Sequence, residues 1–236
     1  MAKIRGLLFD KDGTLIDAVG TWAPVYRGIL EEALQHRAHE WDAVFAKSGF
    51  DAATGKFKPN SLLASGTTDQ FVDLWWPELG PQARAERISW VNGEFVRRSR
   101  EHLKPLMPLA PLLVEFRGMG LKNGIGTNDN ELSARGHMDE LGVGHLFDFI
   151  CGYDSVKRAK PAGDMVHAFC EACGLEPAEV AVIGDNLHDL HMAEDAGAGL
   201  AIGVLTGNSG HEDLSPHADA VLASVAELGA FLEGRV

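Results

Sequence analysis

Short apolar runs recur along the chain, and each has the length of a buried β-strand. Turn-forming or polar residues flank each run, as they do around strands that are covered on both faces. The runs lie at residues 3–9, 121–126, 147–151, 180–183, 200–204 and 220–222. The pattern predicts six buried strands.

Between these runs lie segments whose apolar residues repeat with helical spacing. They cover residues 114–116, 132–141, 165–173, 187–196 and 225–232. Strands and helices that alternate in this way form a parallel sheet with helices on both faces. We therefore expect an α/β fold with a Rossmann-like parallel sheet.

One long segment, residues 16–105, interrupts this alternation. It holds several helical patterns and no convincing buried strand. The first pattern starts at Trp22, and the last opens at Pro81, a residue favoured at the first position of a helix. We expect residues 16–105 to form a mostly helical inserted domain, and residues 1–15 and 106–236 to form a discontinuous α/β core.

Two segments next to or within the insert are rich in turn-forming residues. Residues 49–59 fit either a short hairpin or an irregular loop, and the pattern does not choose between them. Residues 103–111 contain Pro105, Pro108 and Pro111, so we expect a semi-rigid, non-helical linker back into the core.

Composition and charge narrow the classes of partner. The chain has 236 residues, 45% of them hydrophobic, and a formal net charge of -13. This charge disfavours binding to nucleic acid or to an anionic membrane surface. No apolar run approaches the roughly 18 residues of a membrane span or forms a signal-peptide core, so we expect a cytoplasmic protein. The sequence does not indicate the oligomeric state.

Two carboxylates follow the first apolar run. Asp10 and Asp12 are two positions apart, so an extended chain directs both toward the same side, and Gly13 then permits a sharp turn. One such carboxylate can attack an electrophile while the other moves protons, provided that a cation reduces their repulsion. Two solvated capping residues beside a turn would give the same pattern.

Other polar residues follow later strands of the predicted sheet. Thr127 and Asn128 come after the second run, Lys160 lies in the loop after the third, and Asp185 and Asp189 follow the fourth. Singly, these side chains could be helix caps or a solvated lysine. Open α/β sheets bind ligands at the carboxyl ends of their strands, so we expect these residues to converge on one crevice.

In these motifs the sequence resembles the haloacid-dehalogenase-superfamily phosphatases, of the phosphoglycolate-phosphatase-like kind. The matching motifs, in order, are Asp10-Lys11-Asp12-Gly13-Thr14-Leu15, Thr127-Asn128, Lys160-Pro161 and Gly184-Asp185-Asn186-Leu187-His188-Asp189. The resemblance covers nearly the whole chain. Family members with an insert between the first two motifs carry a mostly helical cap that closes over the crevice and helps to select the leaving group.

The resemblance implies a role for each matching residue. Asp10 attacks the phosphorus of a small phosphorylated metabolite, and Asp12 serves as general acid and then as general base. The implied cofactor is Mg²⁺, with Asp10, the Asp12 main-chain carbonyl and Asp185 as ligands.

Three further residues complete the implied site. Thr127, Asn128 and Lys160 bind the substrate phosphate, and Lys160 also balances the charge of the nucleophile. Asp189 acts through water or by orienting Lys160.

Some positions depart from the family pattern or lie outside it. Gly124 and Gly126 occupy strand positions where bulkier β-branched residues are expected, and Lys11 occupies the variable position between the two aspartates. None of these changes removes a catalytic group. We interpret the tryptophans of the insert, Trp22 among them, as core residues of the cap.

Other activities fit the same motifs. A phosphomutase shares the paired aspartates and a cap in the same gap. A dehalogenase is disfavoured by Asp12, because a proton-shuttling acid suits an alkoxide leaving group rather than a halide. Phosphonate hydrolysis needs a cap lysine that the sequence does not single out. A non-catalytic interaction protein on this fold is disfavoured because Asp10, Lys160 and Asp185 are all retained.

Overall fold

A six-stranded parallel sheet forms the centre of the larger part of the molecule. The computed structural model describes residues 3–236, apart from the side chains of residues 36–38. The sheet has the order β5-β4-β1-β6-β7-β8, and every neighbouring pair is parallel. Its strands are β1 (Gly6–Phe9), β4 (Lys122–Gly126), β5 (Phe149–Cys151), β6 (Val180–Gly184), β7 (Leu200–Val204) and β8 (Ala220–Leu222). The predicted α/β fold is confirmed.

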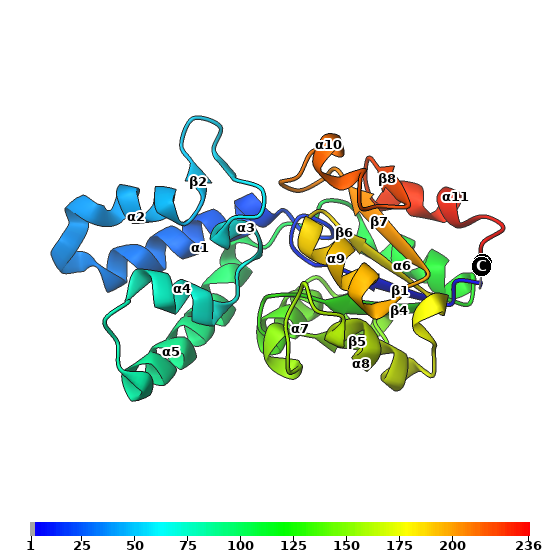
Figure 1. The fold of residues 1–236 in the computed structure, drawn as a ribbon, viewed down its shortest axis with the longest axis horizontal. Coiled ribbons are helices and arrows are strands. Elements are labelled where there is room, and N and C mark those ends of the chain that lie inside the picture. The colour runs from blue at the N-terminus through cyan, green and yellow to red at the C-terminus, as the bar shows by residue number, and fades with distance from the viewer. Residues whose placement is uncertain (1–2) are drawn as a thin grey trace.

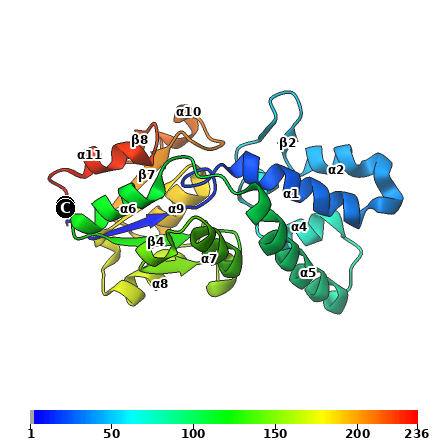
Figure 2. The same cartoon turned by 180° about the vertical axis from the view of Figure 1, so that it is seen from behind.

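Helices cover both faces of this sheet (Figures 1 and 2). They are α6 (Leu109–Gly118), α7 (Glu131–Glu140), α8 (Asp164–Cys173), α9 (Leu187–Ala196), α10 (His211–Leu214) and α11 (Leu228–Leu232). Leu7 and Phe9 of β1 pack with α6, α7 and α11, whereas Leu8 packs with α8 and α9 on the opposite face. This alternation follows from the two-residue period of a strand.

The unusual glycine in β4 is explained by packing. A Cβ atom added to Gly124 would lie 2.8 Å from a ring carbon of Phe169, a fully buried residue of α8. The phenyl ring therefore occupies the space that a β-branched side chain would fill.

The insert forms a second set of helices with its own apolar core. These elements are α1 (Ala18–Ala33), α2 (Trp41–Lys47), α3 (Leu62–Ser65), α4 (Thr68–Trp75) and α5 (Pro81–Ser99). Trp22, Tyr26, Phe71 and Phe95 belong to this core, which is separate from the two clusters that flank the sheet. Figures 1 and 2 show these helices to one side of the sheet.

Two details of the turn-rich segments emerge from the structure. The segment from 49 to 59 contains a short antiparallel hairpin of β2 (Phe50–Asp51) and β3 (Lys56–Phe57). The expectation that residues 103–111 are non-helical is wrong over its last part, because α6 begins at Leu109 after the N-cap residue Pro108. Pro111 fits the first turn of α6, where the backbone N–H needs no intrahelical acceptor.

Short 3₁₀ segments complete the structure. They are η1 (Gln35–Glu40), η2 (Arg100–His102), η3 (Gly144–Leu146), η4 (Tyr153–Ser155), η5 (Pro177–Glu179) and η6 (Val225–Glu227).

Within residues 3–236, none of the helices combines the length and the apolar character needed to cross a bilayer.

Candidate active site

The first acidic motif directly follows β1. The Asp10 amide donates to the Ile183 carbonyl of β6 at 2.7 Å, which continues the strand pairing by one residue. Gly13 then adopts a φ of 85°, in the left-handed region that favours glycine. A Cβ atom at Gly13 would lie 2.7 Å from the Asp185 carboxylate, so the turn also brings the two acidic motifs close together.

Lys160 joins the ends of two distant motifs. Its buried ammonium lies 2.7 Å from Asp10 Oδ1 and 2.5 Å from Asp189 Oδ1. The Lys160 amide donates to Asn128 Oδ1 at 3.1 Å, which holds the lysine loop against the end of β4. Residues from three strand ends thus meet at one ammonium group.

The last acidic motif surrounds the beginning of α9. Carboxylate oxygens of Asp10, Asp185 and Asp189 all lie within 4.8 Å of one another. Asp185 Oδ2 accepts from the Asn208 amide at 3.0 Å, and Asp189 Oδ2 accepts from the Asn186 amide at 3.2 Å. Backbone donors therefore orient the carboxylates of Asp185 and Asp189, whereas the Lys160 ammonium orients that of Asp10.

Burial and the charges of neighbouring groups shift the pKa values of the buried carboxylates and of Lys160. Burial raises the pKa of Asp10 to about 7 against the opposing effect of Lys160, with Asp189 and Asp12 adding to the rise. Burial and the charge of Asp10 raise the pKa of Asp185 well above its usual range. Burial alone lowers the pKa of Lys160, but its ion pairs with Asp10 and Asp189 outweigh burial and raise it.

This cluster has an unbalanced charge. Three buried carboxylates, Asp10, Asp185 and Asp189, face one ammonium, that of Lys160. A hard divalent cation with oxygen ligands would supply the missing positive charge. The donor set, oxygen atoms without sulfur or imidazole, fits Mg²⁺.

Thr127 and Asn128 lie beside this cluster at the end of β4. Thr127 Oγ1 accepts from the Asp129 amide at 3.1 Å, which leaves the hydroxyl hydrogen free to donate to a ligand. Asn128 Nδ2 donates to the Ser65 carbonyl of the insert at 2.8 Å. The end of β4 therefore offers a donor to the crevice and also contacts the inserted domain.

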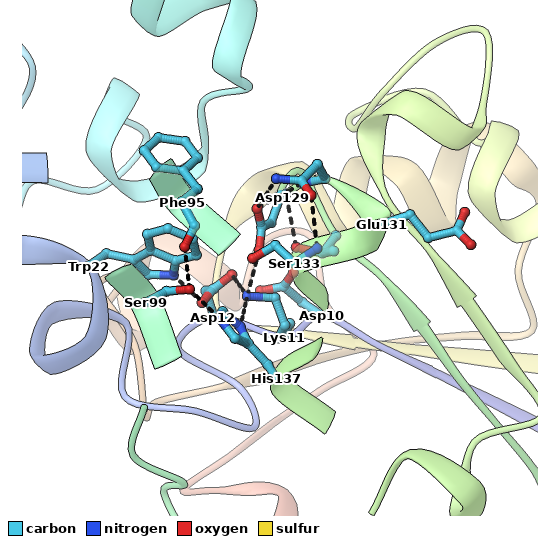
Figure 3. Close-up of polar contacts among 12 residues, drawn as sticks. Asp10, Lys11, Asp12, Trp22, Phe95, Ser99, Asp129, Glu131, Ser133 and His137 are labelled. Atoms are coloured by element: carbon cyan, nitrogen blue, oxygen red, sulfur yellow. Dashed lines mark hydrogen bonds and ion pairs between the residues drawn. The ribbon is translucent and has the colours of Figure 1, made fainter. Parts of the chain in front are cut away.

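The carboxylate of Asp12 is held by two neighbours that the sequence did not indicate (Figure 3). The Trp22 indole N–H donates to Asp12 Oδ1, and the Lys11 ammonium lies 2.6 Å from Asp12 Oδ2. Our interpretation of Trp22 as a core residue is therefore incomplete, because Trp22 is buried and also bonded to the acidic motif. Asp129 was missed as well, although it directly follows the Thr127-Asn128 motif.

A cavity of about 50 Å³ lies between the core and the insert. Its core side is lined by Asp10, Asp12, Thr127, Asn128, Asp129, Lys160, Asn186, His188 and Asp189. Its other side is lined by Ala18, Trp22, Tyr26, Leu63, Ala64, Ser65, Gly66, Thr68, Phe71 and Phe95. All the residues singled out from the sequence line this cavity except Asp185, which lies beneath Gly13.

Comparison with known proteins gives relatives over most of the chain. A phosphoglycolate phosphatase of Chromobacterium violaceum is 28% identical over 235 residues, which cover 95% of each protein. An N-acetylmuramic acid 6-phosphate phosphatase of Pseudomonas aeruginosa is 28% identical over 199 residues, which cover 83% of this chain and 79% of the relative.

A solved structure and a family model agree with these relatives. A β-phosphoglucomutase from Clostridium difficile matches with a TM-score of 0.75 and 16% identity, over 98% of this chain and 96% of that one. At that identity the likeness shows the fold alone. The model for the haloacid dehalogenase-like hydrolases matches residues 4–197. The chain belongs to the haloacid dehalogenase-like hydrolases, and it is a phosphatase of that superfamily, as its motifs predict.

Proposed function

We propose that the chain is a Mg²⁺-dependent phosphomonoester hydrolase that acts on a small phosphorylated metabolite through an aspartyl-phosphate intermediate. The observation that carries the proposal is the position of the Lys160 ammonium, 2.7 Å from Asp10 and 2.5 Å from Asp189, beside the buried carboxylate of Asp185. This arrangement pairs a nucleophile with a fixed positive charge at the place where a phosphoryl group develops negative charge.

A bound cation would complete the charge balance of the site. Asp10, the main-chain carbonyl of Asp12 and Asp185 would hold it, and it would polarise the phosphoryl oxygens of the substrate. Both oxygens of Asp189 already accept, one from Lys160 and one from the Asn186 amide. We therefore assign Asp189 to orienting Lys160 rather than to binding the cation directly.

The reaction proceeds in two displacements. A carboxylate oxygen of Asp10 forms a bond to phosphorus, the bond from phosphorus to the ester oxygen breaks, and Asp12 gives its proton to the departing alcohol. Asp12 then takes a proton from water as that water attacks the acyl phosphate, which releases phosphate and restores Asp10. Thr127 donates to a phosphoryl oxygen, and Lys160 offsets the charge.

The inserted segment, residues 16–105, is the cap of this enzyme in our proposal. It supplies the side of the cavity that faces the nucleophile, with Trp22 and Phe95 among its lining residues. A cap in this position excludes water from the acyl phosphate and contacts the leaving alcohol.

The test is phosphate release from a panel of phosphorylated metabolites, with Mg²⁺ and with EDTA. Release that needs Mg²⁺ and disappears in Asp10→Asn is the expected result. Asp42→Asn, which changes an exposed carboxylate of α2, is the matched control and keeps activity. Full turnover by Asp10→Asn would overturn the proposal.

Two alternatives make different predictions in the same experiment. A phosphomutase, whose fold this chain shares, interconverts sugar phosphates without net release of phosphate. A non-catalytic interaction protein shows no thermal shift with Mg²⁺ and the phosphoryl mimic beryllofluoride. We expect a clear shift that Asp10→Asn removes.

A further inference from the structure

Lys11, the residue between the two catalytic aspartates, has a buried side chain with defined partners. Its ammonium lies 2.6 Å from Asp12 Oδ2, 3.1 Å from Asp129 Oδ2 and 3.2 Å from His137 Nδ1 (Figure 3). An ammonium carries three hydrogens and no acceptor, and here it has three acceptor atoms around it. A lysine with no exposed surface is unusual unless such partners fix it.

The hydrogen bonds of the next residue in this network determine its tautomer. Ser99 Oγ donates its one hydrogen to the Phe95 carbonyl at 2.5 Å. The contact of 2.6 Å between His137 Nε2 and Ser99 Oγ therefore has Nε2–H as its donor. A neutral imidazole has one N–H, so His137 Nδ1 is an acceptor, and Lys11 donates to it.

The network spans the core and the cap. Lys11 and His137, from α7, belong to the core, whereas Ser99 lies at the end of α5 in the cap. Trp22, from α1 of the cap, donates to the second oxygen of Asp12. The Asp12 carboxylate is thus held on one oxygen by a core ammonium and on the other by a cap indole.

We propose that Lys11 is a positioning residue that orients the Asp12 carboxylate for proton transfer, and that His137 and Ser99 link this orientation to helix α5 of the cap. The inference rests on the proposed function, because it concerns the general acid and base of that reaction. In this structure both Asp12 oxygens are held. Movement of α1 and α5 away from the core breaks the contacts of Trp22 and Ser99 and leaves Lys11 as the remaining anchor.

The test is the dependence of kcat/KM on the leaving group. p-Nitrophenolate departs without a proton, whereas an alkoxide needs the proton of Asp12. Lys11→Met should therefore lose at least about tenfold more kcat/KM on an alkyl phosphate than on p-nitrophenyl phosphate. In an Asp12→Ala background, Lys11→Met should cause no further leaving-group-dependent loss of kcat/KM, because the effects of mutating two residues that act as a unit are not additive.

A second variant protects this test against misfolding. Lys11→Met leaves the carboxylates of Asp12 and Asp129 without their ion-pair partner. The double variant Lys11→Met/Asp129→Asn removes one of these two charges. It should show the same selective loss of kcat/KM on alkyl esters. An equal loss on both ester classes, or none, would overturn the role of Lys11 while leaving the proposed function intact. Failure of the wild type to release phosphate from any ester would instead remove the proposed function and this inference with it.

A separate observation concerns the substrate. The cap side of the cavity carries aromatic and aliphatic side chains, with Ser65 and Thr68 as its polar members. Among the described residues that line this side, none is charged, whereas the core side has four carboxylates and one ammonium. The single cation, Lys160, is already paired with Asp10 and Asp189. A second anionic group on the substrate would lie unpaired against aromatic rings, where burial of a charge is costly.

From this lining we infer that the alcohol part of the substrate is uncharged, and this inference also rests on the proposed function. This wall favours a neutral alcohol over an anionic one, because a hydroxyl group can bond to Ser65 or Thr68 while carbon atoms contact Trp22 and Tyr26. Phosphoglycolate, the substrate that the name of the Chromobacterium violaceum relative states, carries a carboxylate next to the ester carbon.

A matched pair of substrates tests this inference. 2-Hydroxyethyl phosphate replaces the carboxylate of phosphoglycolate by a neutral hydroxymethyl group. We expect 2-hydroxyethyl phosphate to have a kcat/KM at least about tenfold higher than that of phosphoglycolate. Leu63→Lys, which adds a cation to the cap wall, should reduce the ratio of these two kcat/KM values. If turnover of both is slow, their inhibition of p-nitrophenyl phosphate hydrolysis gives the same ranking. Equal or better use of phosphoglycolate by the wild type would overturn the inference, while phosphate release from either ester would uphold the proposed function.

Discussion

Lys160 and Asp10, which are 150 positions apart in the sequence, form a buried ion pair with 2.7 Å between Nζ and Oδ1. Asp10 directly follows β1 and Lys160 lies in the loop after β5, and the parallel order β5-β4-β1 places the carboxyl ends of these strands at one edge of the sheet. The same ammonium contacts Asp189, which follows β6. A single side chain therefore links Asp10, the proposed nucleophile, to the last acidic motif.

Removal of this ammonium should slow catalysis. We expect Lys160→Met to lower kcat by about 10²–10³, because a fixed donor next to the transferred phosphoryl group is lost. Steady-state kinetics with saturating Mg²⁺ measure the effect. Lys157→Met, at an exposed position of the same loop, is the control and should keep its rate. A rate for Lys160→Met within a factor of about two of the wild type would contradict this role.

Removal of the buried Asp185 carboxylate should raise the stability of the metal-free protein and abolish its stabilisation by Mg²⁺. Without metal, burial raises the pKa of Asp185, and the charges of Asp10 and Asp189 add to the rise. Asp185→Asn should therefore have a higher Tm than the wild type in EDTA, and it should lose the rise in Tm that Mg²⁺ gives the wild type. Differential scanning calorimetry with and without Mg²⁺ checks both effects. A wild-type-like response to Mg²⁺ in Asp185→Asn would show that the cation binds elsewhere.

The buried imidazole of His137 should make unfolding depend on pH. Burial, with Lys11 and Arg100 nearby, lowers the pKa of His137 from 6.5 to about 2 in the native state. Below about pH 6.5 the unfolded chain binds a proton that the native chain does not. This group therefore contributes its full stability above pH 6.5, and the contribution falls by about 1.4 kcal/mol per pH unit as the pH decreases.

The variant His137→Gln isolates that contribution. Glutamine retains a donor for Ser99 but cannot be protonated in this range. Urea unfolding at about pH 7, 6 and 5 should show a smaller acid-side loss of unfolding free energy in His137→Gln than in the wild type. Parallel pH dependences for the two proteins would argue against a neutral, buried imidazole in the native state.

Two glycines of β4 provide a matched test of packing. A Cβ at Gly124 would lie 2.8 Å from a Phe169 ring carbon, whereas one at Gly126 would have its nearest neighbour at 3.4 Å, the sulfur of Met165. Gly124→Ala should lower the free energy of unfolding by about 1–3 kcal/mol, and Gly126→Ala by much less. Chemical denaturation measures the difference, and Phe169→Leu should restore part of the loss in Gly124→Ala. Equal effects at the two glycines would contradict this account.

The sequence by itself determined the strands, the helices that alternate with them and the acidic motifs. These features depend on local patterns, because the period of apolar residues reports which face of a strand or helix is buried. The helix at Leu187–Ala196 has the bounds that its pattern predicts. The motif residues could be expected to meet, since the carboxyl ends of parallel strands share one edge of a sheet.

Only the tertiary structure decided what surrounds Lys11 and Trp22. Nothing near Lys11 in the sequence indicates His137, which contacts it from α7, or Ser99, which contacts His137 from the end of α5. The same holds for the cavity wall, where Leu63 and Phe95 are brought together by the packing of the cap helices. Pairing between distant side chains depends on how whole elements pack, and a local pattern of apolar residues carries no information about that packing.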